Sequence, residues 1–155
     1  MATGVVVGAA AGAAAMYFFC QQKSASGFLA KVGEAEAALG AANILEPCAA
    51  KELLDATPDA LLLDVQDPGS EMIKGSHSAS LGTLPFKAST DLAEFKDPTI
   101  ADRPKDALII VNCGLGGQAL LGAKLLLDYG FTNVKTIQGG CVAYNKAAPG
   151  KKKNC

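Results

Sequence analysis

The spacing of hydrophobic positions changes near Asn43 in this 155-residue chain. Downstream of that point, Ala60 to Val65 and Ala107 to Val111 are short runs of adjacent apolar residues, which are typical of strands buried on both faces. Ile44-Leu45 and Val134 to Ile137 predict two further strands. The pattern therefore indicates a sheet whose strands lie in the interior.

Helical segments separate these strands. Pro47 opens one helix, and a second runs from Gly116 to Tyr129, ended by Gly130 where a left-handed cap favours glycine. Gly139-Gly140 open a last helix that ends near Ala148. Alternation of buried strands and helices predicts an α/β fold, a doubly wound parallel sheet. Ligands of such sheets bind at the carboxyl ends of the strands.

Upstream of the sheet, four apolar residues share one face at helical spacing and predict an amphipathic helix: Phe28, Val32, Ala35 and Leu39. The helix either packs on the domain or docks to a partner. We expect four segments: a membrane anchor at 1–22, a linker and helix at 23–42, the α/β domain at 43–150 and a basic tail at 151–155.

The segment from Gly4 to Phe19 contains no charged side chain. Its length is near the lower limit for crossing a bilayer, for which about 20 apolar residues are usual. Gly4, Gly8 and Gly12 line one helix face and let another helix approach closely in a membrane. We therefore expect an N-terminal transmembrane helix that contacts other membrane-protein subunits.

Three alternative roles suit the residues of this segment less well. A signal peptide needs a positive start, but no Lys or Arg precedes Lys23; a transit peptide would be rich in Arg and Ser. A buried soluble helix would lose roughly 1 kcal/mol at each of the three glycines. Lys23 and Lys31 follow the segment, which places the domain on the stroma, matrix or cytosol side. The alanine-rich anchor favours an organelle, either the thylakoid or the mitochondrial inner membrane.

Composition excludes several functions. Hydrophobic residues make up 50% of the chain and the net charge is −1, so a packed core is expected and nucleic-acid binding is not. His77 is the only histidine and none of the five cysteines forms a C-x-x-C pair, so we expect neither a metal site nor a cofactor. The odd number of cysteines favours free thiols in a reducing compartment.

Cys113 directly follows a predicted buried strand and precedes a helix. Glycines at 114, 116 and 117 allow the backbone to curl, so that its N–H groups point at the sulfur and stabilise negative charge. The alternative is a structural cysteine. A dinucleotide fingerprint, Gly114-x-Gly116-x-x-Ala119, is not supported, because the next strand ends in Gln138 and not in an acidic residue.

Four groups of motif residues follow one another along the chain: Leu62-Leu63-Asp64-Val65 with Asp67-Pro68 and Glu71, Gly75 to Pro85 with Phe86, Cys113-x-x-Gly116-Gly117 with Leu120, and Gly130 to Val134 with Gly139-Gly140 and Tyr144. In the order and spacing of these motifs, the chain resembles the rhodanese superfamily from about Ile44 to Pro149. The resemblance implies that Cys113 accepts a sulfane sulfur, as a persulfide, from a small donor such as thiosulfate. The substrate-binding loop would be Gly114, Leu115, Gly116, Gly117 and Gln118.

Two departures from the family pattern bear on activity. Gln118 stands where the loop usually ends in arginine, and the lost charge removes roughly 1.5–3 kcal/mol of anion stabilisation. Gln66 replaces another common arginine, and His77 is expected to be a lone polar loop residue. A related phosphatase branch needs a longer loop and the arginine, so phosphatase chemistry is not expected.

Cys141 follows Gly139-Gly140 and is a candidate resolving thiol for Cys113; the alternative is a small apolar residue opening the last helix. Two functions stay open. One is a membrane-anchored sulfurtransferase with weak activity, and the other is an inactive accessory subunit of a respiratory or photosynthetic membrane complex.

Overall fold

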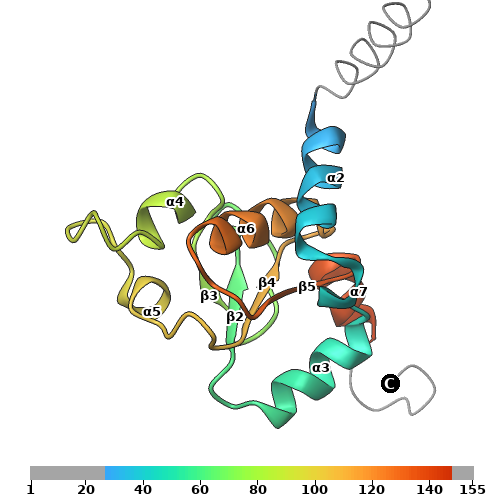
Figure 1. Ribbon diagram of the computed structural model, residues 1–155. Helices are drawn as coiled ribbons and strands as arrows, with labels where there is room; N and C mark the ends of the chain where they lie inside the picture. The colour runs from blue at the N-terminus through green and yellow to red at the C-terminus, as the bar shows by residue number, and fades with distance from the viewer. Residues whose placement is uncertain (1–26, 148–155) are drawn as a thin grey trace, which may run out of the picture. The chain divides into compact units, whose positions relative to one another are not determined.

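The computed structural model describes residues 27–147. The chain divides into two units between Lys31 and Val32, and the second unit contains the sheet. Its five strands are all parallel, in the order β1-β5-β4-β2-β3. They are β1 (Ile44–Leu45), β2 (Leu61–Asp64), β3 (His77–Ser78), β4 (Ile109–Asn112) and β5 (Val134–Ile137). The predicted α/β fold with a parallel sheet is confirmed (Figure 1).

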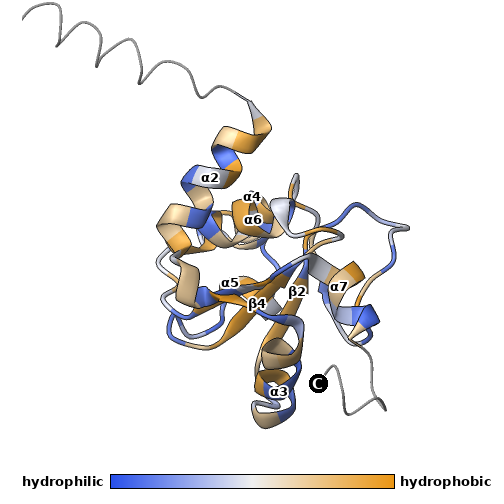
Figure 2. Ribbon diagram, turned by 90° about the vertical axis from the view of Figure 1, so that its right-hand side faces the viewer, coloured by the Kyte–Doolittle hydropathy of each residue, from blue (hydrophilic) through white to orange (hydrophobic). Residues whose placement is uncertain are grey.

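Helices cover both faces of the sheet. They are α2 (Phe28–Leu39), α3 (Pro47–Ala56), α4 (Leu84–Lys87), α5 (Pro98–Ala101), α6 (Gly117–Asp128) and α7 (Gly140–Lys146), with a 3₁₀ turn at Ala41–Asn43. One face packs against α4, α5 and α6, and the other packs against α3 and α7. Every residue of β2 and β4 is buried, so these strands form the hydrophobic centre between the two layers (Figure 2).

Helix α6 packs closely on the first face. A Cβ at Gly122 would lie 3.3 Å from Val65 Cγ1 and 3.4 Å from Leu84 Cδ2, so a larger residue would push the helix away. Gly130 has φ +86° and its N–H donates to Leu127 O, while Phe131 N donates to Leu126 O. These two bonds form a Schellman cap, which confirms Gly130 as the end signal of the helix.

The sequence pattern did not predict β3, α4 or α5, because these elements are short and have no apolar periodicity. The prediction that His77 is a lone loop residue was wrong. It lies in β3, and its Nε2 is 2.6 Å from Asp97 Oδ2. Asp97 also caps α5 by accepting from Thr99 N. Burial alone would raise the pKa of Asp97, but the bonds from His77 and Thr99 outweigh it and lower that pKa.

Some predictions concern residues that the structure does not describe. The glycine-striped segment with Gly4, Gly8 and Gly12, and the basic tail at 151–155, lie outside the described residues. Within residues 27–147, no helix has the length and apolar character needed to cross a bilayer. The helix at Phe28–Leu39 is present; Ala35 and Leu39 are buried, whereas Phe28, in its first turn, is exposed.

Candidate active site around Cys113

Cys113 leaves the carboxyl end of β4 in the middle of the sheet. Its Sγ accepts two backbone hydrogen bonds, from Gly116 N at 3.1 Å and from Ala119 N at 3.3 Å. Cys113 is only 2% exposed. Among the described residues, these two amides are the only donors to its sulfur. The sulfur is therefore held by main-chain dipoles and not by a charged side chain.

The local backbone explains this arrangement. Gly116 has φ +102°, a conformation that favours glycine, and it is the N-cap of α6. The first N–H groups of a helix have no acceptor within the helix, and Ala119 N is one of them. The Cys113 sulfur takes the place that a capping oxygen usually fills, and both amides stabilise negative charge on it. The sequence predicts that backbone N–H groups point at the sulfur; in the structure two amides do so, and the sulfur is buried.

The start of α7 packs directly on the Cys113 loop. Cys141 N donates to Cys113 O at 2.8 Å, and Val142 N donates to Gly114 O at 3.3 Å. Gly140 has φ +62°, and a Cβ there would overlap Cys113 O and lie 2.6 Å from Gly114 O. Glycine at position 140 is thus required by the close contact between the two segments, whereas a Cβ at Gly139 would instead meet Ala143 of the same helix.

Cys141 has a different environment from Cys113. Its Sγ donates to Glu71 O at 3.2 Å, and Gln66 Nε2 lies 3.9 Å from it. Burial raises the pKa of the Cys141 thiol, and the negative charges of Asp64 and Glu71 raise it further. The Cys141 thiol is therefore held in its protonated form.

The expectation that all cysteines are free was only partly correct. Cys113 and Cys141 have free thiols, whereas Cys48 is disulfide-bonded. Spacing along the chain gave no signal for this bond, since the cysteines form no recognisable motif.

A buried polar cluster lies beside the loop. Asp64 is fully buried and accepts from Gln66 N (2.9 Å), Gln66 Nε2 (3.2 Å) and Asn112 Nδ2 (3.0 Å). Gln66 Oε1 lies 3.0 Å from the position of a Cβ at Gly114, so this side chain packs against the loop. In the sequence, Gln66 stands out only as a replacement for an arginine. The polar residues that end β2 and β4, Asp64 and Asn112, were the signal for the cluster.

The rest of the loop faces outward. Leu115 is 77% exposed, and Gln118 is partly buried in the first turn of α6. In the part of the chain that the structure describes, no group of three or more His, Cys, Asp or Glu side chains could hold a metal ion.

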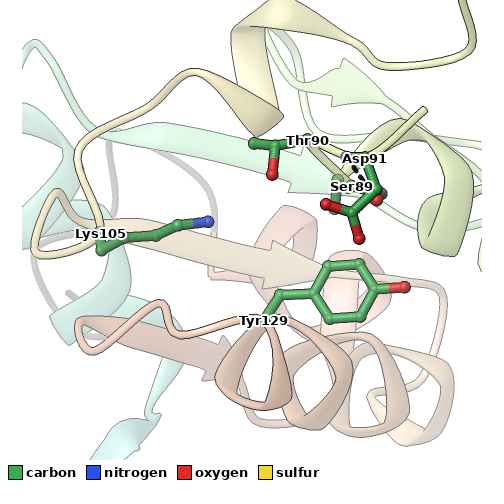
Figure 3. A pocket seen from close by; sticks show the side chains of 6 residues that line it. Ser89, Thr90, Asp91, Lys105 and Tyr129 are labelled. Carbon is green, nitrogen blue, oxygen red and sulfur yellow. Dashed lines mark hydrogen bonds between the residues drawn. The ribbon is translucent and has the colours of Figure 1, made fainter. Parts of the chain in front are cut away.

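A separate hollow of about 240 Å³ lies away from this loop (Figure 3). Lys105, which precedes β4, and Tyr129, which follows α6, line it together with Ser89, Thr90 and Asp91. Because β4 and α6 run in opposite directions, this hollow lies toward the amino ends of the strands. Cys113 does not line it, and we assign it no part in thiol chemistry.

The chain matches the rhodanese-like domain model over residues 46–147. The protein therefore belongs to the rhodanese-like domain family, as the motifs around Asp64 and Cys113 predicted.

Solved structures agree with this assignment. A Rhodopseudomonas palustris protein described as a possible tyrosine phosphatase is 27% identical, with a TM-score of 0.69 over 79% of this chain and 91% of that one. A human single-domain sulfurtransferase is 18% identical (TM-score 0.57, 69% of this chain, 97% of that one). A rhodanese-like domain from Anabaena is 22% identical (TM-score 0.52, 67% and 74%). The last two show the fold alone. No curated protein sequence matches this chain significantly.

Proposed function

We propose that the protein transfers sulfane sulfur through a persulfide on Cys113. The observation that supports this most directly is the pair of backbone N–H groups, from Gly116 and Ala119, that donate to Sγ. A persulfide carries negative charge next to the same sulfur, so amide donors at this position suit a sulfur that bears negative charge before and after loading.

The reaction has two displacements. The Cys113 thiolate attacks the outer sulfur of the donor, the donor's sulfur–sulfur bond breaks, and the donor leaves with the electron pair. A nucleophilic acceptor then attacks the outer sulfur of the Cys113 persulfide and restores the thiolate. No net oxidation occurs, and each step exchanges one sulfur bond for another.

A second candidate function is that of an inactive accessory subunit of a respiratory or photosynthetic membrane complex. Two observations favour it. Gln118 offers no positive charge to an anionic donor, and Cys113 is 2% exposed, which restricts access to its sulfur. In this case the fold would serve for docking, and Cys113 would be structural.

Phosphatase activity is not proposed, although one similar structure is described as a possible tyrosine phosphatase. A phosphate monoester is a dianion, and its binding in such a loop needs a permanent positive charge. Gln118 supplies none.

Membrane attachment and partner binding through Gly4, Gly8 and Gly12 are proposals from the sequence. The apolar run from Gly4 to Phe19 supports them, as does the absence of charge within it. Alkaline extraction of membranes from cells that make the full chain tests attachment: an integral protein stays in the pellet, and release into the supernatant would contradict it. Co-purification with an organellar complex would favour the accessory function.

The role of Cys141 as a resolving thiol stays a prediction. In that step Cys141 attacks the inner sulfur of the Cys113 persulfide, a Cys113–Cys141 disulfide forms, and hydrosulfide leaves. The bond from Cys141 N to Cys113 O shows that the two backbones touch. The raised pKa of Cys141 makes the step slow at neutral pH. Mass spectrometry of the persulfide-loaded chain would detect the disulfide.

Thiosulfate-to-cyanide sulfur transfer tests the proposed function. We expect slow turnover by the full chain, roughly 1,000-fold or more above the rate of Cys113→Ala. Cys141→Ala is the matched control, because it removes an equally buried thiol and leaves Cys113 in place. Equal background rates for the unmodified chain and Cys113→Ala would exclude this donor, and failure to load Cys113 with polysulfide would exclude the persulfide itself.

A further inference from the structure

A second hollow adjoins the Cys113 loop, on its outer side. Its volume is about 240 Å³, and its apolar walls include Val32 of α2, Ile44 of β1 and Leu120 of α6. Pockets for larger ligands usually measure about 300–1,000 Å³. The space therefore suits one side chain or a small molecule and not a cofactor.

The hollow is lined in part by the loop whose N–H groups donate to Cys113 Sγ. Leu115 and Gly116 line it, and the N–H of Gly116 is one of the two donors to Cys113 Sγ. Cys113 itself does not line the hollow. A molecule held here has one end against the loop and must extend over the loop to reach the sulfur. The wall formed by α2 precedes residue 46, where the match to the rhodanese-like domain begins, so the α2 wall lies outside the family domain.

Thr136 of β5 supplies an unpaired polar group to this hollow. The residue is 1% exposed, and its Oγ1 has no hydrogen-bond partner among the described residues. Buried hydroxyl groups in proteins almost always have a partner, which is either a protein group, a water or a ligand. Since Thr136 is one of the residues that line the hollow, its unpaired hydroxyl belongs to the wall of the hollow.

The charge at the hollow has one sign. Glu36 of α2 is the only charged residue among the described residues that line it. Across the loop, Asp64 and Glu71 act on Cys141 as further negative charges, and the neutral Gln118 stands in the loop itself. The charge of Glu36 therefore disfavours an anionic group in the hollow and favours a cationic one, while the N–H groups of Gly116 and Ala119 stay directed at the Cys113 sulfur.

We propose that this hollow binds the non-reacting part of a sulfur acceptor, and that the acceptor is a small thiol with a cationic group. The inference rests on the proposed persulfide chemistry. The acceptor thiol loses its proton to solvent, and its thiolate attacks the outer sulfur of the Cys113 persulfide. The sulfur–sulfur bond breaks toward Cys113, and the acceptor leaves as a persulfide. Glu36 contacts the cation, and Thr136 Oγ1 bonds a polar atom of the acceptor.

Two thiols of similar size and opposite charge serve as probes, cysteamine and 3-mercaptopropionate. In an NMR titration of the full chain, we expect cysteamine to shift the amide signals of Glu36, Gly117 and Thr136, and 3-mercaptopropionate to leave them unchanged. In a second measurement, Cys113 is loaded with polysulfide and the rate of sulfur transfer from the Cys113 persulfide to each thiol is measured. Each rate is divided by the rate at which the same thiol reacts with a small free persulfide, which corrects for the different reactivities of the two thiols. We expect a preference for cysteamine of about fivefold.

Variants locate the effect. Glu36→Gln should abolish the preference for cysteamine. Glu52→Gln, which makes the same charge change at an exposed position of α3, should leave that preference intact. Thr136→Val keeps the side-chain shape and removes a hydrogen-bond acceptor for the ammonium group of cysteamine, so it should weaken cysteamine binding; because Glu36 remains, cysteamine should still be preferred over 3-mercaptopropionate. Equal shifts and equal rates for the two thiols would overturn the proposal. Shifts without loading of Cys113 would support the hollow and contradict the persulfide function, so the two failures are distinguishable.

Discussion

Cys113 and Cys141, the free cysteines that the structure describes at the carboxyl end of the sheet, have the same exposure and different hydrogen-bond partners. Cys113 and Cys141 are each 2% exposed, and their backbones are joined by one hydrogen bond of 2.8 Å. The Cys113 sulfur accepts two N–H groups, whereas the Cys141 thiol donates to a carbonyl oxygen. Burial alone therefore does not distinguish the environments of the two thiols.

The difference in hydrogen bonding comes from the segments in which the two cysteines lie. Cys113 lies three residues before Gly116, the N-cap of α6, where backbone N–H groups without an acceptor inside the helix point at its side chain. Cys141 lies in α7. Its side chain packs in the hydrophobic cluster on the face of the sheet that α3 and α7 cover, beside Asp64 and Glu71. Amide donors stabilise a thiolate, and acidic neighbours with a carbonyl acceptor stabilise a thiol.

The largest effect should follow from separating the two segments. Gly140→Ala places a Cβ against Cys113 O and Gly114 O at a positive φ, so we expect a loss of more than about 3 kcal/mol in the free energy of unfolding. Gly130→Ala is the control, because its φ is also positive but nothing lies near its Cβ position; it should cost only about 1–2 kcal/mol. Urea unfolding measures both. Similar losses for the two variants would contradict the close contact.

The next effect concerns the positive charge that is lost because Gln118 stands where the loop usually has arginine. Gln118→Arg should increase the rate of sulfur transfer from thiosulfate by about 10- to 100-fold, because a charge-assisted contact to the anion contributes roughly 1.5–3 kcal/mol. The double variant Gln118→Arg with Cys113→Ala is the control and should stay at background. An unchanged rate in the single variant would show that access to Cys113, and not charge, limits the reaction.

A smaller effect concerns Cys141. Since the charge of Glu71 raises the pKa of the Cys141 thiol, Glu71→Gln should lower that pKa and increase Cys141 alkylation at fixed pH by about two- to fivefold. Alkylation of Cys113 should change less. The rates follow from mass mapping of labelled peptides. A decrease at Cys141 would show that Glu71 acts through packing and not through charge.

The smallest effect on Cys113 and Cys141 should come from the distant hydrogen-bonded pair of His77 and Asp97. Asp97→Asn keeps the acceptor for Thr99 N but removes the charge that faces His77, at a cost of about 0.5–1 kcal/mol near neutral pH. The pKa of Asp97 is lowered in the folded state, so its contribution is present above the usual pKa of aspartate and lost as pH falls through the folded value. Unfolding at several pH values measures this. A change in the Cys113-to-Cys141 labelling ratio would contradict the independence of the two regions.

Much of the fold follows from local rules. The run Val134 to Ile137 is a strand with the predicted bounds, and Pro47 and Gly130 mark helix ends where the sequence placed them. The short elements β3, α4 and α5 could not be found this way. Their positions depend on tertiary contacts, such as that of His77 with Asp97, which no periodicity encodes.

The site was predicted in part. The sequence located Cys113 and its glycines, because a cysteine between a buried strand and a helix has few geometries available. It did not show that Ala119 supplies the second amide, that Gln66 packs against Gly114, or that the sulfur is buried. Those facts depend on how three separate segments meet at the sheet edge.

Competitive labelling of the native full chain tests the central claim most directly. At neutral pH, iodoacetamide should modify Cys113 at least roughly tenfold faster than Cys141, because burial and the nearby charges of Asp64 and Glu71 raise the pKa of the Cys141 thiol, whereas two backbone N–H groups point at the Cys113 sulfur. Labelling of Cys141 at an equal or greater rate would contradict the account that Cys113 is the reactive thiol. Labelling of Cys113 only as fast as the chain unfolds would contradict it as well.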